Sequence, residues 1–278
     1  MTKQHTTGRS VDDMNPTRTR TTKSRSPGRP TPLVVGGIVT IVAAGTFAAF
    51  PAAALAATPR SSAPSGSSQP SDPACTPAVF SQAQQKVETD LAHRVSQLNS
   101  LLAEVNQPSG HLAPGDKQTL VNDISGFELP GIQGLQAQVQ QATTCAQLRA
   151  DAHSMVFDYR VYVVMTPQTE LTIGADDETY VEDRFVALEP VIAAAIQNAK
   201  AHGKDVTAAE AAFDDLKSQV GAAQSETHGL SVQLLQQEPH GYPANWQVFL
   251  AARTSESNAR TDLHTAYADA EQIREDLK

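Results

Sequence analysis

Acidic side chains gather at one place in the sequence, where they could bind a divalent cation. Asp176, Asp177 and Glu178 are consecutive, and Glu182 and Asp183 follow about one helical turn later. Calcium and magnesium prefer carboxylate oxygens, but a calcium loop also needs alternating ligands and a glycine at its turn, and this run has neither. The pattern is more typical of a solvated helix face, so we predict no metal ligand here.

A second group of residues could bind a small molecule. Met155, Tyr159, Tyr162 and Met165 fall within one strongly apolar stretch, where they could line a pocket between helices. Aromatic and methionine side chains at such spacing more often belong to an ordinary core. The sequence leaves both interpretations open, with the core interpretation favoured.

Motifs that would indicate catalysis are missing from the sequence. It contains no Gly-x-Ser-x-Gly, no phosphate-binding loop, no His-Glu-x-x-His and no dinucleotide-binding fingerprint. The eight histidines are scattered, and none pairs with another at a spacing of three or four residues. We therefore predict no catalytic residue, no cofactor and no metal, and leave open whether the chain is an enzyme.

The two cysteines, Cys75 and Cys145, predict one disulfide in an exported chain. A turn of Pro and Gly residues at about 108–116 separates two predicted helices of similar length. If these helices form an antiparallel hairpin, the start of the first and the end of the second meet at one end of the bundle. The two thiols then lie within bonding distance.

The first 56 residues resemble a secretory signal peptide. A basic segment precedes an apolar stretch from Leu33 to Ala57, and Ala54-Leu55-Ala56 provides a cleavage site after Ala56. The alternative is an uncleaved membrane anchor, because roughly 20 apolar residues can span a bilayer. Residues 57–75 are rich in Ser and Pro, which predicts a flexible linker.

Charge excludes one class of partner. The whole chain has 21 basic and 30 acidic side chains, a net charge of −9. Removal of residues 1–56 takes away seven basic and two acidic side chains and leaves a net charge of −14. Nucleic acids and anionic lipid surfaces require a basic face, so neither is an expected partner of the mature chain. The membrane is a partner only through an uncleaved N-terminal segment.

Apolar residues recur at three- and four-residue steps, which predicts long amphipathic helices. The pattern is clearest over residues 206–234 and 249–277, where only Glu256 is out of pattern. It indicates helices over about 77–106, between residue 116 and Cys145, over 145–201, over 207–237 and from 245 to the C-terminus. Leu129-Pro130-Gly131 should break or kink the second of these, whose predicted apolar face is Leu120, Ile124, Phe127, Leu135 and Val139.

These helices predict an all-α fold, an elongated antiparallel bundle. We expect a first three-helix unit at residues 76–165 and a second at 166–278. If residues 145–201 form one continuous helix, the two units share it and resemble a spectrin rod. Thr166-Pro167 marks either a kink or a new helix start, and a strand near residues 155–165 is the alternative.

The segment Asp158–Gln168, with Leu148–Asp151 before it and Ala175-Asp176 after it, is distinctive. It resembles a group of secreted helical proteins of high-GC actinobacteria, in which an Asp-aromatic-Arg-Val-aromatic run precedes a Pro and an Ala-Asp pair. The resemblance covers residues 145–200 best. It implies an exported, coiled-coil-like fold and carries over no functional residue.

The sequence thus favours a secreted or cell-envelope protein that acts by binding or spacing, with an unknown protein or cell-wall partner. Two alternatives are an enzyme that acts on the cell wall and a helical-bundle carrier of a small ligand. The partner, the oligomeric state and the biological role are not encoded in any motif that we can identify.

Overall fold

The computed structural model describes residues 75–278. Every regular element in this range is a helix, which confirms the predicted all-α bundle. The predicted signal peptide (1–56) and all but the last residue of the predicted linker (57–75) lie outside the described residues. Within the described range, no helix is long and apolar enough to cross a membrane.

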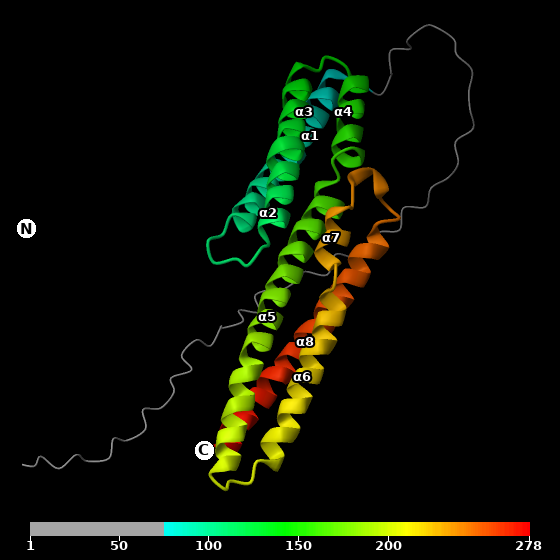
Figure 1. Cartoon of the computed structure of the whole chain (residues 1–278). Helices are drawn as coiled ribbons and strands as arrows, with labels where there is room; N and C mark the ends of the chain where they lie inside the picture. The colour runs from blue at the N-terminus through cyan, green and yellow to red at the C-terminus, as the bar shows by residue number, and fades with distance from the viewer. Residues whose placement is uncertain (1–74) are drawn as a thin grey trace, which may run out of the picture. The chain divides into compact units, whose positions relative to one another are not determined.

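Helix α1 (Pro77–Val105) begins where the sequence predicts. The Thr76 hydroxyl caps it by accepting a hydrogen bond (3.3 Å) from the backbone amide three residues later. Its buried face packs against α3 (Leu129–Gln141), and the Gln84 side chain donates a hydrogen bond to the Val139 carbonyl (2.8 Å). Gln84 is near the start of α1 and Val139 near the end of α3, so the two helices are antiparallel, as predicted (Figure 1).

The chain does not leave the helix at Leu129–Gly131, where the sequence predicted a break or a kink. Helix α2 (Pro114–Val121), the π-helical segment η1 (Asn122–Glu128) and α3 follow one another without interruption. The Leu129 amide donates to the Ile124 carbonyl, five residues back. This wider turn comes immediately before Pro130, whose ring lacks an N–H and would clash with a regular preceding turn. The π-helical segment therefore accommodates the proline without ending the helix.

The wider turn also changes which side chains face the core. Phe127, predicted on the apolar face, is 59 % exposed, so that part of the prediction is wrong. Ile132 and Glu128 are buried instead. A helix with more residues per turn rotates the following positions, so a face predicted from a period of 3.6 residues no longer applies.

The predicted long helix from 145 to 201 is interrupted, although not at its proline. Helix α4 (Cys145–Phe157) ends before a turn in which Arg160 adopts a left-handed conformation, with φ of 45°. The π-helical segment η2 (Val161–Met165) follows and continues directly into α5 (Thr166–Ala201), through Pro167. The helix shared by two units is therefore not formed, and the strand alternative for this segment is also wrong.

The predicted helix over 207–237 is divided as well. Helix α6 (Thr207–Thr227) ends just before Gly229, whose φ of 69° is costly for other residues, and the short α7 (Leu230–Leu235) begins after it. A 3₁₀ turn, η3 (Pro239–Gly241), leads into α8 (Trp246–Asp276). Helices α6 and α8 pack side by side along most of their length, and α5 packs against both (Figure 1).

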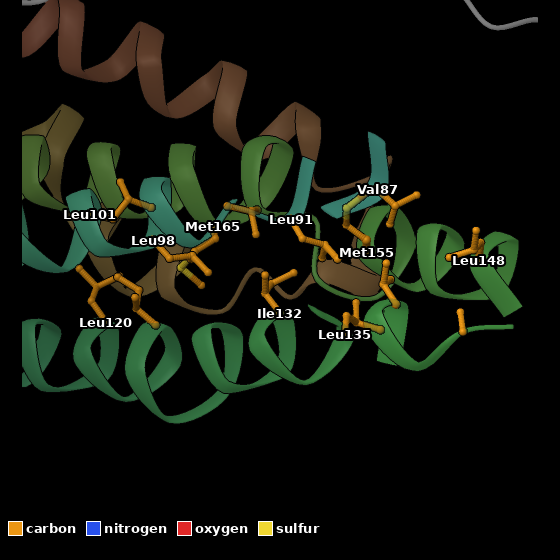
Figure 2. Close-up of a cluster of buried hydrophobic side chains, with 14 of the residues drawn as sticks. Val87, Leu91, Leu98, Leu101, Leu120, Ile132, Leu135, Leu148, Met155 and Met165 are labelled. Carbon is orange, nitrogen blue, oxygen red and sulfur yellow. The ribbon is translucent and has the colours of Figure 1, made fainter. Parts of the chain in front are cut away.

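Three groups of buried apolar side chains hold these helices together. The largest joins α1, the segment from α2 to α3, α4 and η2 (Figure 2). A second lies among α5, α6 and α8, and a third surrounds the start of α5, α7 and the start of α8. Below, the first bundle means α1, α2, η1, α3 and α4, and the second bundle means α5, α6 and α8.

Candidate functional site

The structure does not gather the four candidate ligand-lining residues around one pocket. Met155 and Met165 are buried and belong to the core of the first bundle, where Figure 2 shows them among the aliphatic side chains. Tyr162 is exposed, and the Arg94 guanidinium lies 5.0 Å from its ring centroid. Of the four, only Tyr159, which is partly buried, lies near a group with a strongly raised pKa, the carboxyl of Glu128.

Tyr159 packs its ring onto the helix that carries Glu128. A Cβ at Gly131 would lie 2.1 Å from the Tyr159 ring, so this close approach requires glycine. The Tyr159 ring also contacts the Phe127 ring, with centroids 6.0 Å apart. Burial, and then the nearby Glu128 carboxyl, raise the pKa of Tyr159.

Glu128 is a buried acid that the sequence does not reveal. Its side chain is 1 % exposed, and its Oε2 atom has no hydrogen-bond partner among the described residues. Burial, together with the Asp123 charge, raises the pKa of Glu128 to about 8. The group is therefore neutral at pH 7, but it is enclosed by the core and not open to a substrate.

The acidic run in α5 is not a solvated face. Asp176, Glu178 and Glu182 are buried, whereas Asp177 and Asp183 are not. The prediction is therefore wrong for three of the five residues. Helix α5 is covered on more than one side, by α6 and α8 and by the connection that follows α1, so Asp176, Glu178 and Glu182 become enclosed although they lie on different faces.

Two of these carboxylates hold the connection between α1 and α2. The Ala113 amide donates to Asp176 Oδ2 (2.8 Å), and the His111 amide donates to Asp177 Oδ1 (3.2 Å). The His111 ring stacks on Tyr180, with centroids 3.6 Å apart. Burial raises the pKa of Asp176 to about 6, against the opposing effect of the Ala113 hydrogen bond. The role of this pair is to fix the connection on α5.

Two more of the five, Glu178 and Glu182, belong to a cluster between α5 and α8, here called the carboxyl cluster: Glu178, Glu182, Glu256 and Arg260. Arg260 Nε lies 2.8 Å from Glu178 Oε1, and Arg260 Nη2 lies 2.9 Å from Glu256 Oε2. The Thr227 hydroxyl of α6 donates to Glu182 Oε1 (3.0 Å). Glu256 is the residue that interrupts the apolar pattern of the last helix, and this exception was the one sequence signal of the cluster.

Burial controls the protonation of the carboxyl cluster. It raises the pKa of Glu178 to about 8, a shift that Glu256 increases and Arg260 opposes. Burial likewise raises the pKa of Glu256 to about 7, against the attraction of Arg260. The pKa of Glu182 is also raised by burial, although the Thr227 hydrogen bond lowers it. One guanidinium thus compensates only part of the cost of enclosing three carboxyl groups.

The cluster does not have the geometry of a metal centre. Among residues 75–278, no group of three or more His, Cys, Asp or Glu side chains is arranged to hold a metal ion. The chemistry that this arrangement can support is the binding and release of protons within a helix interface.

The predicted cysteine pair lies at the end of the first bundle. Cys75 and Cys145 are at disulfide distance, with Cα atoms 6.1 Å apart, which is within the usual range for a disulfide. The bond joins the residue before α1 to the first residue of α4. Beside it is an open apolar groove of about 270 Å³, lined mainly by Val79, Ala83, Val87, Leu148 and Ala152.

Comparison with known proteins identifies no relative. No protein-family model, no curated protein and no solved structure matches this chain. Its function therefore has to be inferred from its own residues.

Proposed function

We propose that the chain is an exported helical protein, secreted or retained in the cell envelope, that acts by binding or spacing and not by catalysis. The observation that carries this proposal is the pairing of Cys75 with Cys145. Disulfides persist in oxidising compartments outside the cytoplasm, and this one lies where the predicted Ser/Pro-rich linker meets the first helix. Such a bond would keep a load on the linker from unwinding α1.

The distribution of polar groups supports a non-catalytic role. The carboxyls of Glu128, Glu178, Glu182 and Glu256 belong to residues that are at most 6 % exposed, so they are enclosed in helix interfaces. A general acid or base must reach the proton that it transfers, so these groups are poorly placed for catalysis on a polymer such as peptidoglycan. The resemblance of residues 145–200 to secreted helical proteins agrees with this role and remains a prediction.

Two assays test the proposal on protein purified with its disulfide intact. Zymography on peptidoglycan should show no clearing, whereas a clear band lost on Tyr159→Ala would favour the cell-wall enzyme and overturn the proposal. Mild crosslinking in cell-wall extracts should give a defined adduct with the oxidised chain. Recovery of no adduct would contradict the binding role. The Cys75→Ser/Cys145→Ser double variant shows whether the adduct depends on the disulfide.

A further inference from the structure

The centre of the second bundle contains more buried negative groups than positive ones. Glu178 and Glu182 on α5 and Glu256 on α8 are 5 %, 3 % and 6 % exposed, and Arg260 bridges Glu178 and Glu256. If all three carboxyls ionised, the interface would contain an excess of buried negative charge, which is costly unless it is paired.

The charged and titratable groups that face this centre come from several helices. Helix α5 also contributes Glu170 and Asp183, and α8 also contributes Arg253. Helix α6 contributes the uncharged hydroxyl of Thr227, and α1 contributes Glu104, which lies near Glu170. These neighbours are three carboxyl groups and one guanidinium group, so they do not cancel the excess of acidic groups in the cluster.

The Glu256 carboxyl is also enclosed by the backbone of the opposite helix. A Cβ at Gly174 of α5 would lie 2.8 Å from Glu256 Oε1, and this oxygen has no hydrogen-bond partner among the described residues. The other oxygen, Oε2, lies 2.9 Å from Arg260 Nη2, so the guanidinium compensates the charge of Glu256 from one side only. Burial of the rest of the carboxyl favours its protonated form.

We propose that Glu178, Glu256 and Arg260 form a proton-operated clasp between α5 and α8, which is closed while the two glutamates retain protons and loosens when both ionise. In the closed form, Arg260 bridges the two side chains and Glu256 packs on Gly174. In the open form, the two carboxylates repel each other across the interface and water enters between the helices. The raised pKa values of Glu178 and Glu256 agree with opening at mildly alkaline pH.

Hydrogen exchange on the full chain tests the clasp. We expect amides of residues 174–182 and 253–260 to exchange about tenfold faster at about pH 8.5 than at about pH 5.5, after correction for the intrinsic pH dependence. Glu178→Gln and Glu256→Gln replace the acid with a neutral side chain of similar shape, so each should reduce this difference and the double variant should abolish it. Glu238→Gln, at an exposed position before α8, is the matched control and should behave as the unmodified chain.

Two results would overturn the clasp. One is equal protection of both segments at the two pH values in the unmodified chain, and the other is an undiminished pH effect in the double variant. If the double variant does not fold, carboxyl ¹³C titration of glutamate-labelled unmodified chain decides. At least two glutamates, besides the one whose signal Glu128→Gln removes, should then titrate above about pH 6.5, and ordinary titration of all the others would reject the clasp.

Discussion

The buried side chains of the two bundles differ in size. The first bundle is filled with large aliphatic side chains and is closed by a disulfide. The second bundle places alanine at many of its contacts, and the fully buried ones are Ala209, Ala223, Ala259 and Ala266. Small side chains let helix backbones approach closely, and they cover less apolar area than leucine or isoleucine.

This difference changes how each bundle tolerates a buried acid. In the first bundle, no described cation lowers the pKa of Glu128, which is enclosed in an aliphatic core. In the second bundle, close helices bring carboxyls from α5 and α8 around Arg260. A lone buried acid has no cation to oppose the rise of its pKa, whereas Arg260 opposes the rise that burial causes in the pKa of Glu178 and of Glu256.

The largest expected effect is loss of the disulfide, which should act on the first bundle alone. The bond closes a loop with a sequence separation of 70 residues, and the chain-entropy model gives about 4 kcal/mol for this length. Urea unfolding of the Cys75→Ser/Cys145→Ser variant should show this loss. Hydrogen exchange should locate it in α1, α3 and α4. Equal loss of protection in α6 and α8 would show that the two bundles do not differ in this way.

A cavity in the aliphatic core should have the next largest effect. Leu98 of α1 is fully buried, so Leu98→Ala should reduce the free energy of unfolding by about 3 kcal/mol. Thermal unfolding measured by circular dichroism checks this value. The exposed Val79 of the same helix is the control, and Val79→Ala should change stability far less.

In the second bundle, enlarging a buried alanine should destabilise the chain. Ala259 is fully buried in α8, so Ala259→Leu should push α6 and α8 apart and cost about 2 kcal/mol. The same substitution at the exposed Ala268 should be nearly neutral. If Ala259→Leu stabilised the chain, the second bundle would have unfilled space, and close approach of its helices would not explain the carboxyl cluster.

The last effect concerns pH and the lone acid of the first bundle. The pKa of Glu128 is about 8 in the folded chain, above its ordinary value of 4.5, so its favourable contribution is complete below pH 4.5 and is lost as pH rises toward 8. Glu178, Glu256 and Asp176 have shifts of the same sign. The unfolding temperature should therefore be highest in mild acid and should fall as the pH rises to 9.

Glu128→Gln separates this contribution from that of the cluster. We expect it to stabilise the chain at about pH 8, because a neutral amide avoids the cost of ionisation, and to have little effect at about pH 4. Chemical unfolding at the two pH values measures the difference. An equal effect at both would mean that Glu128 has an ordinary pKa.

Regular periodicity predicted most of this fold. The helix starts at Pro77 and Thr207, the antiparallel placement of α1 and α3 and the cysteine pair all follow from apolar spacing and turn composition. These signals are local, or they depend only on helix length, so a single sequence contains them.

The wrong predictions have physical causes that the spacing of apolar residues does not reveal. A π-helical turn before Pro130 rotated Phe127 out of the core and Glu128 into it. The left-handed Arg160 divided a long helix where no glycine or proline indicates a break. The burial of Glu178 and Glu182 depends on neighbours distant in sequence, and only Glu256, as the exception in an apolar stripe, hinted at the cluster.

The central claim is that the chain is exported and that a disulfide joins Cys75 and Cys145 in its first bundle. Peptide mapping under non-reducing conditions tests this claim most directly. It should be done on protein recovered from outside the cells that make it. The account predicts one peptide pair joined through Cys75 and Cys145, in a chain whose N-terminus is near Ala57. Two free thiols, or a chain found only in the cytoplasm with residues 1–56 retained, would contradict it.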